Sequence, residues 1–318
     1  MIKSFNNSLK MFETARTLIP SCTQTFSKGF TQFSYGAAPI FIKRGIGNHV
    51  WDLDENEYID YSMALGPVIL GHSYPAVNKS ISHQLQDGIT YFLPHPLEVL
   101  LAKKLVEIIP CAEMVRFGKN GSDVTSGAVR VARAYTERDK IACCGYHGWQ
   151  DWYIGTTTRN KGVPKAVQEL TMTFEYNNIE SLKKLFDENR DSIAAVIMEP
   201  VGVIKPEDGF LEEVKEIAHK NGALLIFDEI VTGFRISLGG AQEYYDVTPD
   251  LTCVGKAMAN GMPLSAVVGK REFMEVFDEI FFSFTFGGEV LSIAASIVTI
   301  RELKKKGLLN ICGSRGKN

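Results

Sequence analysis

An acid and a lysine that each follow a short apolar run are the strongest candidates for chemistry in this sequence. Asp228 follows the run Ala223–Phe227, and Lys256 follows the run Leu251–Val254 after one glycine. If both runs are neighbouring strands of an α/β sheet, the two charged side chains meet at one edge, where such folds bind ligands. We therefore expect Asp228 and Lys256 to hold the two ends of one bound molecule.

The surroundings of Lys256 are small and apolar, with no acid within four positions. Loss of hydration lowers the pKa of a lysine and leaves a nucleophilic amine, which suits a Schiff base with an aldehyde. The alternative is a lysine with a buried stem and a solvated tip. A buried carboxylate such as Asp228 also needs a partner. That partner can be a protonated ring nitrogen, a following backbone segment that it caps, or Mg²⁺ shared with Glu199 and Glu229.

A predicted strand meets a Gly121-Ser122-Asp123 turn at the start of a predicted helix. Free N–H groups and the helix dipole make such a point suitable for a phosphate. The alternative is helix capping by Ser122 or Asp123, which is the favoured interpretation of this motif alone. No G-x-x-x-x-G-K-[ST] motif is present, which argues against a nucleotide hydrolase.

Two further motifs present groups of the same kind. Tyr146 and His147 lie between two glycines after a predicted strand, and could offer an aromatic face to a planar ring or form a buried turn. Phe284–Glu289 precedes the last helix and could be a second anion site or a simple glycine turn. A phosphate site, an aromatic face, an acid for a ring nitrogen and an isolated lysine are together what pyridoxal phosphate requires.

Composition narrows the class of protein. The 318 residues are 45% hydrophobic and 22% charged, with a net charge of −3. These values are ordinary for a globular protein, and they give no basic field for nucleic acid or anionic membrane. The six cysteines form no C-x-x-C pair and no Cys/His metal spacing. The N-terminus lacks a signal-peptide pattern and no run approaches a membrane span, so we expect a cytoplasmic protein.

Apolar periodicity predicts an α/β protein in which helices alternate with parallel strands. A helix at 8–18 and an antiparallel unit at 39–61 are expected at the N-terminus, with a loop at 21–38 between them. Residues 63–72 are expected to form a buried loop. The expected helices are 75–87, 96–109, 122–136, 211–221 and one from about 288 to 306, and the expected strands are 114–117, 140–144, 193–198, 223–227, 251–254 and 266–269.

In these and other motifs the chain resembles the class III (fold type I) pyridoxal-phosphate aminotransferases, most closely the glutamate-1-semialdehyde aminomutase-like branch. The similarity covers nearly the whole chain. The motifs that carry it are DLDENEYIDYSMALGPVILGH, NGSDVTSGAVRVARAYTERDKI, GYHG, EPVG, LLIFDEIVTGFR, PDLTCVGKAMANGMPLSAVVG and TFGGEVLSIAA.

The resemblance implies a mostly parallel central sheet with helices on both faces, a small α+β domain, and roles for named residues. Lys256 would form a Schiff base with the cofactor and then move protons as acid and base. Asp228 would pair with the pyridinium nitrogen. The remaining implied cofactor contacts are Gly121 and Ser122 at the phosphate, Tyr146 and Ile230 on the two ring faces, His147 and Glu199 near the ring, and Thr285 at the phosphate of a neighbouring subunit in a homodimer with shared active sites.

The sequence departs from the aminomutase pattern in two places. Lys28 stands where the pattern has a carboxylate-binding arginine, which replaces a bidentate fork by a point charge. Residues 199–210 read EPVGVIKPEDGF, where the pattern has a shorter E-P-V-x-x-N stretch. Both departures favour a transaminase with another substrate.

The length also differs from the family pattern, because family members continue into a C-terminal small domain. We expect an N-terminal segment and part of the small domain at 1–65, the large cofactor-binding domain at 66–306, and the start of a missing C-terminal domain at 307–318. The predicted function is amino transfer between an amino-acid donor and an oxo acid, aldehyde or keto-sugar acceptor. The alternatives are glutamate-1-semialdehyde 2,1-aminomutase and an inactive truncated remnant.

Overall fold

A seven-stranded sheet forms the centre of the protein. The computed structural model describes residues 4–307. The strand order is β4-β10-β9-β8-β7-β5-β6, and only β10 runs antiparallel to its neighbours. The strands are β4 (Met114–Gly118), β5 (Lys140–Cys144), β6 (Thr171–Thr173), β7 (Ile193–Met198), β8 (Leu224–Glu229), β9 (Leu251–Val254) and β10 (Ser265–Gly269). The predicted α/β class with a mostly parallel sheet is confirmed.

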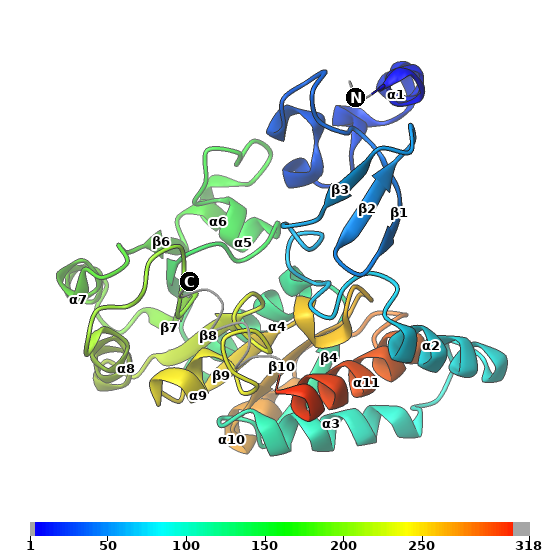
Figure 1. Ribbon diagram of the computed structural model, residues 1–318. Helices are drawn as coiled ribbons and strands as arrows, with labels where there is room; N and C mark the ends of the chain where they lie inside the picture. The colour runs from blue at the N-terminus through cyan, green and yellow to red at the C-terminus, as the bar shows by residue number, and fades with distance from the viewer. Residues whose placement is uncertain (1–3, 308–318) are drawn as a thin grey trace.

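Helices cover both faces of this sheet (Figure 1). The strands β7, β8, β9 and β10 are buried at every position because each face of the sheet has its own core. Ile141 and Cys143 pack with α4 on one face, whereas Ala142 and Cys144 pack with α7 and α8 on the other. The helices are α2 (Pro75–Asp87), α3 (Pro96–Ile108), α4 (Gly121–Thr136), α5 (Asp151–Ile154), α6 (Lys165–Gln168), α7 (Ile179–Glu188), α8 (Phe210–Lys220), α9 (Ala241–Tyr245), α10 (Arg271–Met274) and α11 (Val290–Lys306), with 3₁₀ turns η4 (Lys256–Ala259) and η5 (Glu275–Asp278).

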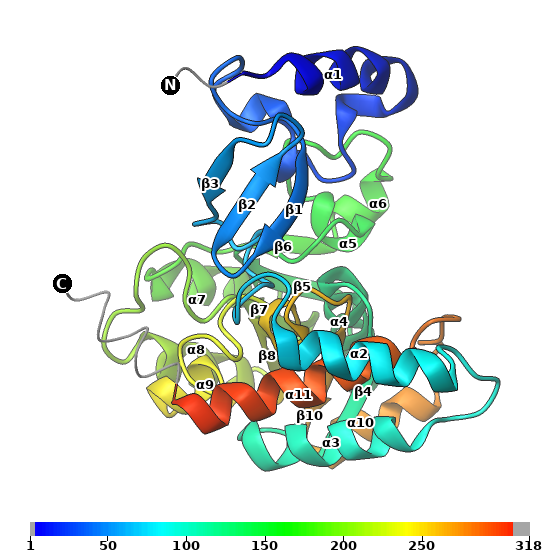
Figure 2. The same cartoon turned by 45° about the vertical axis from the view of Figure 1, so that its right-hand side comes forward.

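A small N-terminal unit stands on the large domain (Figure 2). It consists of α1 (Asn6–Leu18), three 3₁₀ turns and an antiparallel sheet of β1 (Ile42–Ile46), β2 (His49–Asp52) and β3 (Glu57–Ile59). The carboxylate of Asp54 accepts hydrogen bonds from the backbone N–H groups of Asn7 and Ser8 at 2.8 and 2.9 Å, which fastens α1 to the sheet. The 3₁₀ turns are η1 (Pro20–Cys22), η2 (Phe26–Lys28) and η3 (Phe30–Gln32).

The predicted helices and strands are confirmed with ends that differ by a residue or two, as element boundaries commonly do. Two predictions need correction. Asp228 is the fifth residue of β8 and does not lie beyond it. The 63–72 loop is only half-buried over most of its length, because it lies between the two units and keeps contact with solvent. The ten-residue helix α7 and the short elements β6, α5, α6, α9 and α10 were not predicted.

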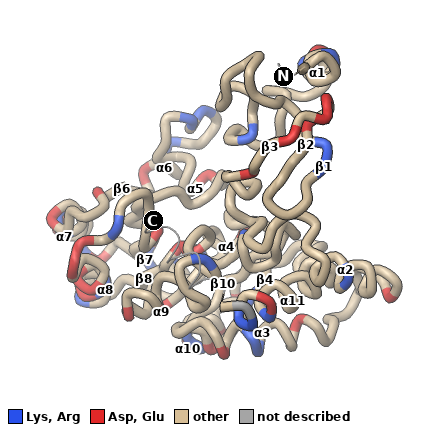
Figure 3. The backbone as a smooth tube through the Cα atoms, in the orientation of Figure 1, with Lys and Arg blue, Asp and Glu red and all other residues tan. Residues whose placement is uncertain are grey.

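The domain boundaries at 65 and 306 stay predictions. The small sheet precedes residue 65 and the large sheet follows it, while residues 308–318 of the expected third segment lie outside the described residues. Within residues 4–307, no helix combines the length and apolar character needed to cross a bilayer. Charges of both signs lie along the outer helices α2, α7 and α8 (Figure 3).

Candidate active site

Asp228 and Lys256 reach the same edge of the sheet because β8 and β9 are neighbouring parallel strands. Asp228 pairs in register with Cys253, three residues before Lys256. Only 4% of Asp228 is exposed, and its Oδ2 lies 2.8 Å from Nδ1 of His147. Its Oδ1 accepts a hydrogen bond from the N–H of Ile230 at 3.1 Å. The carboxylate is therefore buried, oriented and paired, as a buried charge must be.

Lys256 begins the 3₁₀ turn η4 with a left-handed φ of 40°, which is strained for a residue with a side chain. Burial lowers the pKa of its amine, while the carboxylates of Asp228 and Glu199 oppose that shift and Arg235 adds to it. Within the described part of the chain, Lys256 Nζ makes no hydrogen bond and no ion pair. The structure therefore presents a partly desolvated amine without a fixed partner.

The turn that follows β5 brings a second acid to the site. Gly145 has φ of 106°, and a Cβ there would lie 2.6 Å from Oε2 of Glu199, so only glycine allows this approach. Glu199 Oε2 accepts a hydrogen bond from the N–H of Tyr146 at 2.9 Å. Burial raises the pKa of Glu199, the Tyr146 N–H lowers it, and the charge of Asp228 raises it further.

His147 is fully enclosed at 1% exposure and lies behind Asp228. Its second ring nitrogen, Nε2, lies 3.2 Å from the carbonyl oxygen of Cys144. The ring stacks on Trp152 at an interplanar angle of 16°, and Tyr153 meets it edge-on. His147 thus supports Asp228 from inside the protein.

The start of α4 leaves two amide donors free. The Asp123 carboxylate accepts hydrogen bonds from the N–H groups of Lys119 and Asn120 at 3.1 and 2.7 Å, so Asp123 caps this turn, as one interpretation expected. The N–H groups of Gly121 and Ser122 have no hydrogen-bond partner among residues 4–307. Capping and anion binding are therefore compatible here, because they use different N–H groups.

The β5 turn packs directly against this helix start. A Cβ on Gly148, whose φ is 109°, would lie 2.2 Å from Ser122 Oγ. The Ser122 hydroxyl accepts a hydrogen bond from the N–H of Trp149 at 3.0 Å. Ile230 fills the space between Gly121 and Gly255, since a Cβ on either glycine would lie 3.2 or 3.0 Å from its side chain.

Glu229 has a structural role that its neighbour Asp228 does not share. It is fully buried, and burial raises the pKa of its carboxyl group. It accepts hydrogen bonds from Thr232 Oγ1 at 2.8 Å, from the N–H of Ala241 and from Gln242 Nε2 at 3.0 Å. It therefore caps α9 and shapes the 230–240 loop. No three carboxylate, histidine or cysteine side chains within residues 4–307 are grouped to hold a metal ion.

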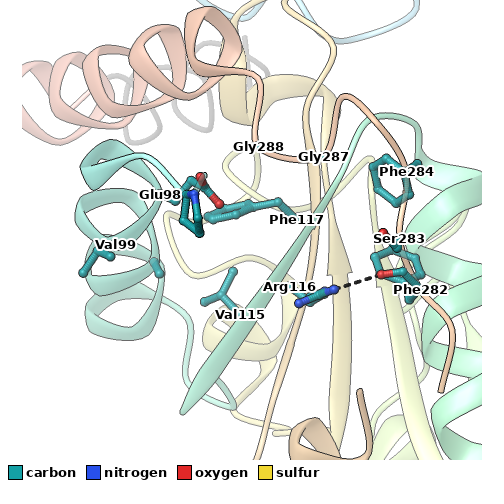
Figure 4. Close-up of a pocket in the computed structure, with 12 residues that line it drawn as sticks. Glu98, Val99, Val115, Arg116, Phe117, Phe282, Ser283, Phe284, Gly287 and Gly288 are labelled. Carbon is teal, nitrogen blue, oxygen red and sulfur yellow. Dashed lines mark hydrogen bonds between the residues drawn. The ribbon is translucent and has the colours of Figure 1, made fainter. Parts of the chain in front are cut away.

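Three predicted residues lie outside this cluster. The Tyr146 ring is 62% exposed and meets Tyr153 edge-on at 5.6 Å. Lys28 is exposed on η2 of the N-terminal unit, and Thr285 is exposed in the 282–288 loop. The 282–288 loop, together with α3 and β4, lines a hollow that is separate from the Asp228–Lys256 cluster (Figure 4).

Sequence reasoning missed two residues near the site, Arg235 and Asn260. The Arg235 guanidinium donates a hydrogen bond to the carbonyl oxygen of Gly66 and raises the positive potential at Lys256. Asn260 accepts a hydrogen bond from the N–H of Leu70 at 2.8 Å and donates one to Gly71 O at 3.1 Å. The sequence does show an arginine, Arg235, in the Gly-rich loop after Asp228. It does not show the bonding partner of Arg235, Gly66, which lies 169 residues away in the chain.

The residues present fit pyridoxal phosphate. Two free amide donors suit its phosphate, an oriented carboxylate suits its ring nitrogen, and an amine with no fixed partner suits its aldehyde. Ile230 offers an apolar contact for one ring face.

Comparison with known proteins agrees with this chemistry. The chain matches the family profile "Aminotransferase class-III" over residues 31–317. It is 42% identical to a 3-aminobutyryl-CoA aminotransferase of Cloacimonas acidaminovorans over 98% of this chain and 76% of that protein. It is also 42% identical to a glutamate-1-semialdehyde 2,1-aminomutase of Desulforamulus reducens, over 97% and 75%.

Solved structures show the same architecture. The FumI protein of Sphingopyxis sp. MTA144, solved in its PLP internal aldimine form, superposes with a TM-score of 0.89 at 30% identity, over 94% of this chain and 73% of that one. An omega-transaminase from Sphaerobacter thermophilus gives a TM-score of 0.85 at 31% identity, over 93% and 72%. The fold and the site define a fold type I enzyme that uses pyridoxal phosphate. Within that class, the chain belongs to the class-III aminotransferases.

Proposed function

We propose that this enzyme transfers an amino group between an amino-acid donor and an oxo acid, aldehyde or keto-sugar acceptor. The observation that carries the proposal is the partly desolvated Lys256 amine, which has no fixed partner and lies at the same sheet edge as the buried pair of Asp228 and His147. When bound, pyridoxal phosphate supplies an aldehyde that bonds to amino groups and a ring that accepts electrons.

The proposed role of Lys256 is to bond the cofactor at rest and to carry a proton between two carbon atoms during turnover. Burial lowers the pKa of its amine, which brings it closer to neutral pH and makes it a better acid and base. Asp228 holds a proton at the ring nitrogen, and His147 fixes the orientation of that carboxylate. Glu199 remains a nearby acid that orients the Tyr146 backbone.

The proposed phosphate site is the start of α4. Gly121 and Ser122 donate their free N–H groups, and the helix dipole adds to the attraction for an anion. Tyr146 and Ile230 are the proposed contacts on the two ring faces. Because Tyr146 is largely exposed here, its ring is free to lie against the cofactor.

The identity of the substrate is the open part of the proposal. Lys28 remains our candidate for a substrate carboxylate, since it is a single exposed positive charge on η2. The second candidate function is intramolecular transfer, as in glutamate-1-semialdehyde 2,1-aminomutase, which several relatives are named for. The long 199–210 loop favours the intermolecular reaction, and an inactive remnant is the third outcome to test.

The proposal includes a homodimer with shared active sites, in which Thr285 reaches the phosphate in the partner subunit. Large apolar side chains are exposed on the α2–α3 connection and on the 281–286 loop, including Phe92 at 97% and Phe281 at 78%. Both segments border the hollow of Figure 4, which is lined by Pro94, Phe282 and Phe284. A joined apolar surface of this kind is typical of a protein–protein interface. The unpaired cysteines of the described residues support a cytoplasmic setting.

The test is a donor panel on the protein reconstituted with pyridoxal phosphate. A transaminase releases 2-oxoglutarate from glutamate or pyruvate from alanine, whereas an aminomutase needs no external donor. Lys256→Ala should lower kcat about 1000-fold or more. Lys270→Ala, at the opposite sheet edge, is the matched control and should retain activity. A folded protein that binds the cofactor and turns over neither a donor nor glutamate-1-semialdehyde would favour the remnant.

A further inference from the structure

The segment that joins α5 to α6 carries positive charge and no acid. Arg159, Lys161 and Lys165 are exposed, and residues 152–168 contain no aspartate and no glutamate. The acids that flank this segment in the sequence are Asp151 and Glu169, at its two ends. Within the described part of the chain, none of the three cationic side chains forms a hydrogen bond or an ion pair. We call these three side chains the 159–165 patch.

An aromatic ring of the N-terminal unit supports the arginine of this patch. The Arg159 Cζ lies 4.4 Å from the centre of the Phe26 ring, a cation–π contact. The ring orients the guanidinium, while all five N–H donors remain without a protein acceptor. The contact joins the α5–α6 segment to η2, and both cartoon views place these parts of the molecule beside each other (Figures 1 and 2).

The backbone that carries the patch is held by its own side chains. The N–H of Val163 donates to the carbonyl oxygen of Asn160 at 3.0 Å, and Gln168 Nε2 donates to the carbonyl oxygen of Val163 at 2.8 Å. Lys161 lies inside this closed turn. The next residue, Gly162, has no atom within 4 Å of the position its Cβ would take, so the turn faces open space. The charges are therefore presented outward from a fixed loop.

One short helix connects the patch with the wall of the proposed active site. Tyr153 of α5 meets the His147 ring edge-on at 5.2 Å, and its hydroxyl donates to the carbonyl oxygen of Gly145 at 2.9 Å. The patch follows α5 in the chain, and none of its three side chains bonds to the Asp228–Lys256 cluster within residues 4–307. It is therefore separate from the reacting amine but attached to the same wall.

The charge of the patch differs from that of the other basic group on this surface. Lys183, Arg190 and Lys220 line a hollow between α7 and α8, but Asp187 and Asp191 line it too. The 159–165 patch has no such acids, and its charge opposes the net charge of −3 of the whole chain. Blue segments lie on the loop before α6 and on the facing turn of the N-terminal unit (Figure 3).

This chemistry selects a phosphate group over a single carboxylate. A phosphate carries up to two charges and three acceptor oxygens, so it can use several cations at once. Arginine offers it a planar fork of donors, and lysine adds a point charge. A carboxylate carries one charge and needs only one of these partners. Lys28, on the same turn as Phe26, stays our separate candidate for a substrate carboxylate.

We propose that the 159–165 patch is a subsite for a phosphate group at the far end of an extended substrate, whose amino or carbonyl end reacts at Lys256. The substrate class is then an amine or carbonyl compound with a terminal phosphoester. This inference rests on the proposed transaminase function and deepens it.

The first test measures anion binding without turnover. Calorimetric titration of the holoenzyme with pyrophosphate should show binding that weakens as salt is added. Arg159→Gln/Lys161→Gln should lower this affinity about tenfold or more. Arg190→Gln/Lys220→Gln is the matched control, because it removes the same two charges from the α7–α8 hollow, and it should change the affinity less than about twofold. Equal affinity in the wild type and both variants means an adventitious ion only and would overturn the subsite.

The second test uses two amino donors that differ only in a terminal phosphate. With 2-oxoglutarate as acceptor, the wild type should prefer 6-aminohexyl phosphate over 6-aminohexan-1-ol about tenfold or more in kcat/KM, mainly through KM. Shorter and longer chains locate the best fit. Arg159→Gln/Lys161→Gln should reduce the preference to about twofold or less. If the amines inhibit glutamate turnover instead of reacting, the ratio of their inhibition constants answers the same question.

These outcomes separate the sources of the anion. Pyrophosphate binding at the patch with no preference for a phosphorylated donor at any chain length would overturn the substrate role and indicate a free anion. Retention of a single-stranded oligonucleotide, with no competition by pyrophosphate, would also overturn the proposal. A wild type that uses no donor at all would instead overturn the proposed function, while the pyrophosphate result stays valid.

Phe26→Leu tests the support of the arginine and leaves every charge in place. Phe26 is 62% exposed, so its loss should not unfold the N-terminal unit. Without the ring, Arg159 is no longer oriented, and the pyrophosphate affinity should fall about threefold. Phe33→Leu is the matched control, because Phe33 is 53% exposed in the same unit. Equal affinities in the two variants would show that the ring does not position the arginine for an anion.

Discussion

At the scale of single residues, burial controls the chemistry of this site. The same cause lowers the pKa of the Lys256 amine and raises the pKa of the Glu199 carboxyl group. Both shifts favour the neutral form, because a charge loses hydration when it is buried. Asp228 differs in having a histidine and a backbone N–H as partners. The site therefore combines two groups that burial shifts toward the neutral form, Lys256 and Glu199, with one acid, Asp228, that has hydrogen-bond partners.

Two acids with pKa shifts of opposite sign, Glu199 and Glu289, should affect stability differently as the pH changes. The raised pKa of Glu199 means that its carboxyl group keeps its proton to a higher pH in the folded state than in the unfolded chain. As the pH rises from the ordinary pKa through the raised one, the folded state therefore loses stability relative to the unfolded chain. Glu199→Gln should therefore raise the Tm of the apoprotein at pH 7 and match the wild type near the ordinary glutamate pKa of about 4.3. Thermal melts across this range check the prediction.

Glu289 is the control of opposite sign. Burial raises the pKa of Glu289, but the ammonium of Lys119, 2.8 Å away, together with hydrogen bonds from Ser292 and Leu291, outweighs that effect and lowers the pKa overall. Its contribution to stability is present above the ordinary glutamate pKa and is lost as the pH falls through the lowered one. Glu289→Gln should cost about 1.5–3 kcal/mol at pH 7. If both variants shift the Tm in the same direction at pH 7, the assignment of these two acids is wrong.

At the scale of elements, the site is an edge shared by the ends of parallel strands and the start of one helix. The β5 turn must pass very close to α4, and Gly148 makes this approach possible. The same contact places the Ser122 hydroxyl on the N–H of Trp149. The free donors at the start of α4 thus depend on the packing of a neighbouring loop.

Gly148→Ala should damage the proposed phosphate site directly. The added methyl group would lie 2.2 Å from Ser122 Oγ, so the turn and the helix must separate. We expect a loss of about 1–3 kcal/mol in stability, and an affinity for pyridoxal phosphate that is lower by about tenfold or more. Fluorescence titration and chemical denaturation measure the two effects.

Gly162→Ala separates backbone strain from crowding. Gly162 has a similar φ of 95°, but nothing lies within 4 Å of the position its Cβ would take. This variant should lose some stability and keep its cofactor affinity. Equal losses of affinity in the two variants would show that strain alone, and not the contact with Ser122, explains the result.

At the scale of the whole molecule, one group of exposed apolar side chains lies on the α2–α3 connection and the 281–286 loop. In the proposed homodimer this surface is buried, and Thr285 reaches the partner subunit. In this proposal Thr285 contributes to the site of the partner subunit, which accounts for its absence from the Asp228–Lys256 cluster of its own chain.

The double variant Phe92→Glu/Phe281→Glu should weaken the dimer about 100-fold or more, since two central aromatic anchors are each worth roughly 2 kcal/mol. Light scattering across a dilution series measures the change. Val203→Glu is the matched control, because Val203 is equally exposed but lies in the loop after β7. A wild type that is monomeric at all concentrations would contradict the proposed homodimer.

Much of the fold and the cofactor site was predictable from local patterns. Apolar runs, glycines and helix periodicity predicted β4, α4, β5, β7, β8 and β9, whose ends carry most of the candidate residues. The prediction that Asp228 and Lys256 share an edge is confirmed by the pairing of β8 with β9. The short element β6 was missed because three residues carry too little periodicity.

The sequence by itself determined the class of fold, the family and the residues that end each strand, because those signals lie within short, periodic or motif-like stretches. Only the tertiary structure decided that His147 supports Asp228, that Glu229 caps a helix, and that Arg235 bonds the carbonyl oxygen of Gly66. Met63, Ala64 and Leu65 adopt left-handed backbone conformations, for which these residue types carry no local preference. That conformation depends on contacts with residues far away in the chain, which form only when the two units pack together.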